Sequence, residues 1–129
     1  MIDDKTLPTP RPDEVQVIQT YGDGRFRISN LIHDGAVLVT PKLTLAWPVA
    51  DWKNVSFASL APLFAEGRRC EILLIGAGAR PWPLSSALRH ELRGMGVVAD
   101  VMDTGAACRT YNVLLAENRL VAAALLPLA

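Results

Sequence analysis

The stretch that decides the fold comprises three successive runs: CEILLIGAG (residues 70–78), VVADVM (residues 97–102) and DTGAACRTYNVLL (residues 103–115). The first run holds a continuous apolar stretch, which is typical of a strand buried on both faces of a sheet, and the second run is again an apolar strand. A helical pattern separates them, so strand, helix and strand follow one another within about 30 residues, the length of a βαβ unit. This order predicts two parallel strands joined by a right-handed crossover, and hence an α/β fold.

Three helices are predicted in the second half of the chain. The first covers residues 59–66, with the serine at its first position as the N-cap. The second starts at the serine pair 85–86, and its apolar spacing places Met95 on the inward face together with two leucines. The third covers residues 106–117 and turns Tyr111 inward. A last strand is predicted over residues 120–126.

The first half of the chain is rich in short strands. Glycines in the YGDG run (residues 21–24) supply the positive φ of a tight turn, so the flanking alternation predicts a β-hairpin. Residues 33–35, which include His33, are predicted to form another turn. The expected strands lie around Val15–Val17, around Phe26–Ile28, at residues 36–40 and at residues 43–47. Together these elements predict a layered α/β domain with a small antiparallel addition.

Composition excludes several classes of function. The chain has 129 residues, and its 13 basic and 13 acidic side chains cancel. Nucleic-acid binding needs a clustered basic footprint, whereas Arg68-Arg69 is only a short surface run. We therefore expect no nucleic-acid partner. The longest apolar run, residues 120–126, is far shorter than the roughly 20 residues of a membrane helix, so no membrane insertion is expected.

Domain organisation and compartment follow from the same composition. Three prolines within residues 1–12 predict a flexible N-terminal segment, followed by a single α/β domain over residues 13–129. Two cysteines, Cys70 and Cys108, make no disulfide framework, and no signal peptide is recognised at the start of the chain. We expect a cytoplasmic protein. The apolar N-terminal strands leave a sheet edge through which the chain could self-associate.

The two apolar strands place a candidate ligand site at their carboxyl ends. In α/β sheets ligands bind in the crevice outside these ends, and the free amides at a helix start attract anions. Arg109 adds a fork of donors suited to carboxylate or phosphate. The residues expected to hold a small anionic ligand there are Gly76, Gly78, Thr104, Cys108, Arg109, Tyr111 and Asn112.

Each of these residues also has a structural interpretation. Asp103 can neutralise Arg109 in an internal ion pair, and either Asp103 or Thr104 can cap the following helix. Tyr111 can bury its ring, and Asn112 can tie a loop backbone to the helix. Pro81 stands where a dinucleotide fingerprint needs its third glycine, so no cofactor is predicted.

Cys108 raises the question of catalysis. A thiol in the first helical turn beside an arginine is expected to have a lowered pKa. A cysteine nucleophile also needs a base, and only His33 and His90 are available, neither in a suitable position. No complete catalytic constellation is present, so no catalytic residue is assigned. Metal binding is not expected, because the histidines and cysteines lack ligand spacing.

The run from Asp103 to Leu114, the ILLIGAG run (residues 72–78), the glycines at 94 and 96, and the run from Glu117 to Leu126 resemble one known family. This is the mitochondrial complex I assembly factor three family, which includes bacterial and archaeal domains of unknown function. The resemblance covers Val15 to Leu126. It implies a single three-layer α/β domain in which helices and a smaller antiparallel β layer flank a mixed central sheet.

The same resemblance implies a function. Mitochondrial members help to assemble respiratory complex I through protein contacts, without an established enzymatic reaction. The leading expectation is therefore a non-enzymatic assembly or interaction protein whose partners include respiratory complex subunits or assembly factors. Trp82, held between two prolines in a loop, is the expected partner contact. The anionic-ligand module and, after it, a Cys108-dependent enzyme remain the alternatives.

Overall fold

The computed structural model describes residues 15–129, so the expected flexible segment, residues 1–12, lies outside the described residues. The strands are β1 (Ile18–Gly22), β2 (Arg25–Ile28), β3 (Leu31–Asp34), β4 (Val37–Thr40), β5 (Leu43–Ala46), β6 (Ile72–Gly76), β7 (Val98–Met102) and β8 (Val121–Leu125). The α-helices are α1 (Phe57–Leu60), α2 (Ser86–Gly94) and α3 (Thr104–Ala116), and the 3₁₀ segments are η2 (Trp52–Asn54) and η3 (Ala61–Gly67).

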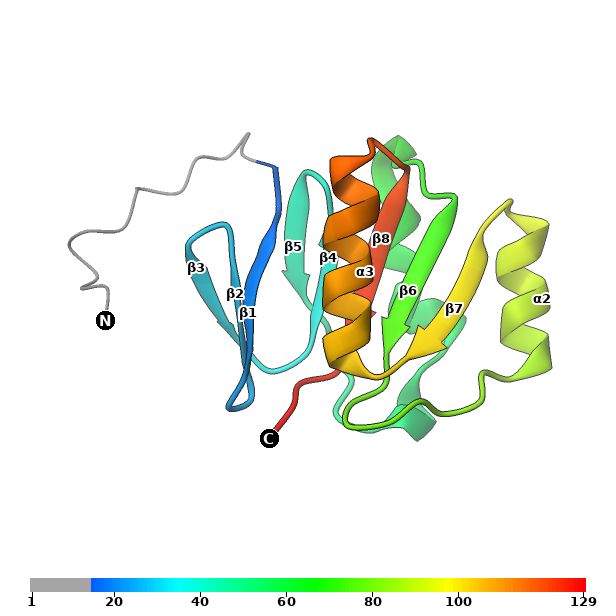
Figure 1. The fold of residues 1–129 in the computed structure, drawn as a ribbon. Helices are drawn as coiled ribbons and strands as arrows, with labels where there is room; N and C mark the ends of the chain where they lie inside the picture. Colours follow the sequence, from blue (N-terminus) through cyan, green and yellow to red (C-terminus); the bar gives the residue numbers. More distant parts are fainter. Residues whose placement is uncertain (1–14) are drawn as a thin grey trace.

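A mixed five-stranded sheet of order β5-β4-β8-β6-β7 forms the centre of the molecule (Figure 1). β6 pairs in parallel with β7 on one side and with β8 on the other. β4 runs antiparallel to both β8 and β5. The predicted βαβ unit is confirmed, with α2 between the neighbouring strands β6 and β7. The separate β1-β2-β3 sheet is antiparallel throughout.

Successive side chains of the central strands point to opposite faces of the sheet, so the core is divided into two clusters, one on each face. Leu73 and Ile75 of β6 face a cluster with side chains of α1, η3 and α2, among them Leu60 and Leu92. Leu74 of the same strand faces the opposite cluster, built with α3 and the small sheet. In Figure 1, α3 lies in front of the central sheet, with the β1–β3 sheet beside it. The three-layer α/β architecture is thus confirmed.

The helix predicted over residues 59–66 differs in start and geometry. Ser56 is its N-cap, and Ser59 completes a capping box three residues later. Only one short α-helical turn forms before the chain tightens into η3, where Pro62 has no N–H to donate. Glu66 then adopts a left-handed conformation, with φ of 58°. The Ser56 and Ser59 side chains bond to backbone N–H groups at the start of the helix, so the helix begins three residues earlier than predicted.

The other two helices follow the sequence more closely. Ser85 is the N-cap of α2, and Asp103 is the N-cap of α3. Each residue was one of the two candidates that the sequence offered for its helix. Tyr111 is fully buried, as predicted. The prediction that Met95 points inward is wrong, since the residue is 48% exposed. The reason is that α2 ends at Gly94, so Met95 already belongs to the turn that leaves the helix.

The turn predicted at residues 33–35 is also wrong in part. His33 lies in β3, which pairs with β2 and places His33 opposite Phe26. The actual reversal is at Ser29 and Asn30, both with positive φ, of 45° and 72°. Because this turn contains no glycine, its residues carry a weaker turn signal than the Gly35 that follows β3.

Candidate functional site

The carboxyl ends of β6 and β7 are neighbours, as expected for a shared crevice. Gly76 pairs with Met102 at the last position of both strands. The Ala77 N–H donates to the Met102 carbonyl at 2.9 Å, and the Thr104 N–H donates to the Gly78 carbonyl at 2.9 Å. These bonds join the two strand ends directly, so the backbone of one loop lies against the backbone of the other.

Thr104 lies at the centre of this junction. Its hydroxyl accepts from the Gly78 N–H at 2.9 Å and donates to the Leu126 carbonyl at 2.7 Å. The Leu126 N–H in turn donates to the Gly76 carbonyl at 2.9 Å. The Thr104 side chain is completely buried and thereby links the ends of β6, β7 and β8. Its hydrogen-bonding capacity is used inside the protein.

Gly76 contributes by its lack of a side chain. A Cβ atom at this position would lie 2.9 Å from Thr104 Oγ1 and 3.0 Å from the Thr104 Cα. Such separations are below van der Waals contact, so any larger residue would push the start of α3 away from β6. Gly76 therefore permits close packing of helix on strand. The space expected for a ligand at this strand end holds Thr104.

The start of α3 is partly occupied as well. The Asp103 carboxylate accepts from the Ala106 N–H at 2.9 Å, so an anion already sits at the helix N-terminus. The ion pair expected between Asp103 and Arg109 is not among the salt bridges formed by residues 15–129. Arg109 is exposed and donates from Nη1 to the Tyr21 hydroxyl of β1 at 2.6 Å.

Cys108 differs from expectation in the sign of its pKa shift. Only 1% of the residue is exposed, within the core cluster between α3 and the small sheet. Burial raises the pKa of the Cys108 thiol to about 12, although the Arg109 charge acts in the opposite direction. The expected lowering is therefore wrong, because desolvation of a thiolate outweighs an adjacent exposed guanidinium. A thiol in this state is a poor nucleophile near neutral pH.

Tyr111 and Asn112 hold the first strand against α3. The Tyr111 hydroxyl donates to the Gln16 carbonyl at 2.8 Å, and burial raises the pKa of this phenol. The Asn112 amide accepts from the Ile18 N–H at 3.0 Å and donates to the Ile18 carbonyl at 2.8 Å. Asn112 thus offers β1 the same pair of bonds that a neighbouring strand would offer.

The predicted site residues fall into two groups. Gly76, Gly78 and Thr104 close the ends of the central strands, whereas Arg109, Tyr111 and Asn112 bind the small sheet, with Cys108 packed beneath them. Gly105 belongs with the second group, because a Cβ there would lie 3.1 Å from the Tyr21 hydroxyl. We call this second set, including Gly105, the α3 clasp. Anion binding at these residues stays a prediction.

Trp82 lies in the loop that connects β6 to α2. Its side chain is 47% exposed. Beside the loop is a cavity of about 320 Å³, lined by residues of η2 and the start of α2: Trp52, Lys53, Val55, Pro83, Leu84, Ser85 and Leu88. The Trp52 indole N–H donates to the Pro83 carbonyl at 3.3 Å, which joins the two walls of this cavity.

Sequence reasoning missed a second hollow, at the other end of the central sheet. Its volume is about 470 Å³, and it lies between the β4–β5 turn, the end of η3 and the first residues of β8. Arg68, Arg69 and Cys70 line it. The arginine pair was visible in the sequence only as a surface run, because nothing in its spacing indicates what folds against it.

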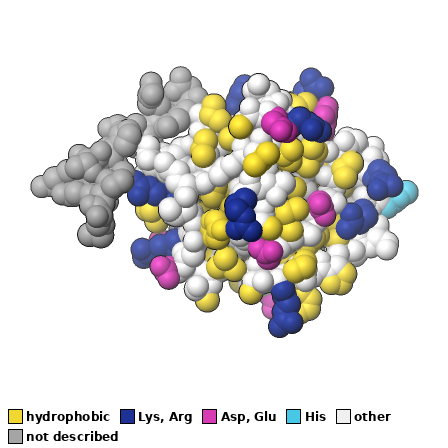
Figure 2. Space-filling view, viewed as in Figure 1, with side chains coloured by type: hydrophobic (Ala, Val, Ile, Leu, Met, Phe, Trp, Pro, Cys, Tyr) yellow, Lys and Arg dark blue, Asp and Glu magenta, His cyan; other side chains and the backbone are white. Residues whose placement is uncertain are grey.

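Three further observations bear on the class of protein. Within residues 15–129, no three histidine, cysteine or acidic side chains lie close enough together to hold a metal ion. The helices of this region are all too short or too polar to cross a membrane. On the face shown in Figure 2, basic and acidic side chains are interspersed among hydrophobic ones, without a continuous basic field.

Fold and site together define a three-layer α/β domain whose most distinctive polar side chains bind its own elements to one another. The chain belongs to the family described as Protein of unknown function (DUF498/DUF598), whose model matches residues 18–126. The family resemblance drawn from the sequence is confirmed by named relatives as well as by this match.

Two of the similar proteins illustrate the family. An uncharacterized protein of Rhodobacter capsulatus is 40% identical over 111 residues, which are 86% of this chain and 84% of that protein. The NADH dehydrogenase [ubiquinone] 1 alpha subcomplex assembly factor 3 of Xenopus tropicalis is 37% identical over 114 residues. The match covers 88% of this chain and 62% of the frog protein, so the chain spans less than two thirds of that relative.

A solved structure supports the fold. The crystal structure described as an outer membrane protein from Bartonella henselae superposes with a TM-score of 0.82 at 34% sequence identity. The superposition covers 92% of this chain and 98% of that one. The architecture described above is therefore shared along nearly the full length of both chains.

Proposed function

We propose that this protein is a non-enzymatic assembly factor that acts by binding other proteins, with respiratory complex I subunits or assembly factors as its partners. The observation that carries the proposal is the set of relatives named as complex I assembly factors, including the frog protein at 37% identity. A cytoplasmic location belongs to the same proposal. The buried Cys108 thiol supports the non-enzymatic part of the proposal, because such a thiol is a poor nucleophile.

The partner surface we propose is the Trp82 loop and the cavity beside it. Aromatic side chains that anchor in or beside pockets dominate the energetics of protein interfaces. Trp82 combines large exposed area with a backbone restrained by Pro81 and Pro83, so little conformational entropy is lost when a partner covers it. The cavity lined by Trp52 and Leu84 would receive an apolar side chain of the partner.

The test is affinity capture of the full chain from its native host after mild cross-linking. We expect respiratory complex I subunits or assembly factors in the captured material. Trp82→Ala should weaken partner binding by about 30-fold, the effect of losing a central aromatic anchor. Binding is best measured with the purified partner by a concentration series, so that a weaker affinity is distinguished from a smaller yield.

Met95→Ala is the matched control. Met95 is exposed to almost the same fraction as Trp82, 48% against 47%, and it lies at the other end of α2. This substitution should leave partner binding unchanged. If Trp82→Ala and Met95→Ala bind the partner equally well, the Trp82 surface is not the interface. If no respiratory protein is captured at all, the assembly role itself is contradicted.

A further inference from the structure

The hollow of about 470 Å³ described above opens where two central strands separate. β4 and β8 pair only as far as Val39 and Ala123. Beyond that pair, β4 turns at Pro41 towards β5, whereas β8 continues back to its start at Val121. The space between them is closed on its third side by the end of η3. We call this hollow the β4–β8 groove.

The floor of the β4–β8 groove is apolar. Leu63, Val121 and Ala122 line it and are each about 1% exposed, so their side chains are fixed in the core. Leu120 and Pro41 are half-buried along the walls. An apolar chain of several methylenes could lie along this floor and remove both its own surface and that of the wall residues from water.

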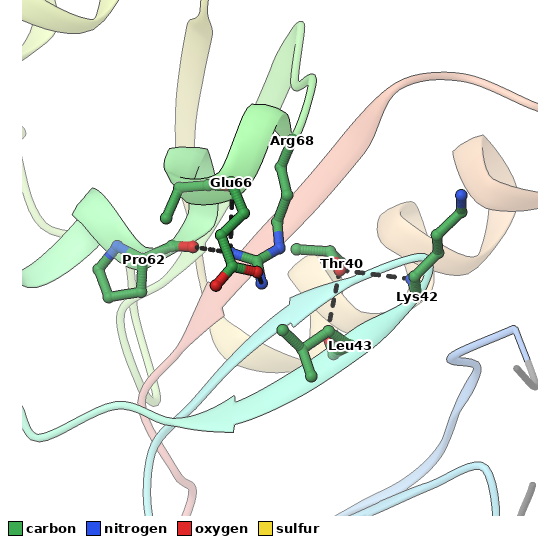
Figure 3. A network of polar contacts seen from close by, with 7 residues as sticks. Thr40, Lys42, Leu43, Pro62, Glu66 and Arg68 are labelled. Atoms are coloured by element: carbon green, nitrogen blue, oxygen red, sulfur yellow. Dashed lines mark hydrogen bonds and ion pairs between the residues drawn. The ribbon is translucent and has the colours of Figure 1, made fainter. Parts of the chain in front are cut away.

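The rim of the groove carries an excess of positive charge. Arg68 donates to the Pro62 and Ala65 carbonyls at 2.8 and 3.2 Å and pairs with Glu66 at 3.2 Å, so these two charges compensate each other. Figure 3 shows this network across from the turn that carries Thr40 and Lys42.

The two remaining cations of the rim are uncompensated. Lys42 and Arg69 are exposed, and neither has a side-chain ion pair or hydrogen bond within residues 15–129. Glu66 is the only acidic side chain that lines the groove within the same part of the chain, and it is already paired. An apolar floor below two free cations is complementary to one kind of ligand.

We propose that the β4–β8 groove binds a small amphipathic anion, with a single apolar chain on the floor and a carboxylate or phosphate group at Lys42 and Arg69. Its volume lies within the range of about 300–1,000 Å³ typical of small-ligand sites. The Arg69 guanidinium can bind such a head group in a bidentate manner, whereas Lys42 supplies a point charge. This site is separate from the Trp82 surface, so either proposal can fail without the other.

The first experiment is calorimetric titration of the full chain with decanoate at concentrations where the ligand is monomeric. We expect saturable binding at one site. Octanoate should bind about tenfold more weakly, because each methylene laid on the floor contributes about 0.8 kcal/mol. Decanol has the same alkyl chain as decanoate but no charge, so it tests the head-group contacts. It should also bind at least about tenfold more weakly than decanoate.

The combined substitution Lys42→Gln and Arg69→Gln should weaken decanoate binding by about tenfold or more. The matched control is Arg80→Gln with Arg93→Gln, which removes two exposed cations elsewhere without touching the groove. Vesicles of phosphatidylglycerol form a second arm. If the native protein binds the vesicles and the Lys42/Arg69 variant does not, the ligand of the groove is a lipid. If only decanoate binds, the ligand is a free amphiphile.

Cys70 provides an independent readout of occupancy. It lines the groove and is half-buried, whereas Cys108 is buried in the core. Burial raises the pKa of the Cys70 thiol to about 11, so the alkylation is followed at alkaline pH, where enough thiolate is present. Decanoate should slow the alkylation of Cys70 by a maleimide severalfold in the native chain and not in the Lys42/Arg69 variant. The proposal is overturned if neither decanoate nor the vesicles bind, or if the Lys42/Arg69 variant binds as tightly as the control variant.

Discussion

At the scale of single residues, Thr104 shows how a side chain suited to ligand binding can serve the fold. Its hydroxyl accepts from the Gly78 N–H and donates to the Leu126 carbonyl in a fully buried position. Removal of the hydroxyl leaves both backbone groups without this partner. Buried groups left in that state cost about 1–3 kcal/mol each, far more than the net value of an ordinary hydrogen bond.

Thr104→Val preserves the side-chain shape and removes only the hydroxyl. We expect the free energy of unfolding to fall by about 2 kcal/mol or more, measured by urea denaturation. Thr110→Val makes the same chemical change on the same helix at a partly exposed position and should cost less than about 1 kcal/mol. Equal stability of the two variants would contradict the structural role of Thr104.

The residue scale also shows the limits of sequence reasoning. The sequence left Asp103 and Thr104 as alternative caps of the third helix, and the structure assigns the cap to Asp103. The pKa of Cys108 was predicted with the wrong sign, because a sequence shows the neighbouring arginine and not the depth of burial. The partner of Arg109 was missed for a similar reason, since Tyr21 lies 88 residues away in the chain.

At the scale of elements, the α3 clasp joins two sheets that share no strand pairing. Asn112 supplies both bonds to the Ile18 backbone, and the Tyr111 hydroxyl adds a third to Gln16. Beneath these bonds, Ile18, Phe26 and Ile28 bury their side chains against α3. Packing provides most of the attachment, and the polar bonds fix the position of β1 along the helix.

Asn112→Asp tests this attachment. The variant keeps an acceptor for the Ile18 N–H but places a carboxylate oxygen against the Ile18 carbonyl, which is repulsive. We expect amide exchange in β1 to accelerate by about tenfold or more, whereas β6 keeps its protection. Asn118→Asp, on the exposed turn after α3, is the matched control. Unchanged protection of β1 in the Asn112 variant would show that Asn112 does not position the strand.

Some strands and helices were predicted from the sequence, whereas others were missed or predicted only in part. β6 and β8 were predicted because a strand buried on both faces leaves a continuous apolar run. β7 was predicted from its apolar residues although it is an edge strand with exposed positions. β3 was missed, since three of its four residues are exposed and its turn contains no glycine. Residues 59–66 were predicted as one helix, whereas the chain forms a single α-helical turn capped by Ser56 and then a 3₁₀ segment that contains Pro62.

At the scale of the whole molecule, the Trp82 surface and the β4–β8 groove are lined by residues other than those of the strand-end junction that the sequence favoured. The Trp82 loop was predicted from the sequence because prolines on both sides of an aromatic residue are visible there. The β4–β8 groove was not predicted, since it arises where strands far apart in the chain diverge. The predicted neighbourhood of the β6 and β7 ends is confirmed, and Thr104 occupies the space between them.

We propose that this protein works by binding proteins rather than by holding an anionic metabolite at Arg109. Native mass spectrometry of the chain, purified gently from its own host, tests that claim most directly. We expect a complex whose added mass corresponds to one or more respiratory complex I subunits or assembly factors. A chain without any protein partner, carrying a small anionic molecule that Arg109→Ala removes, would contradict it.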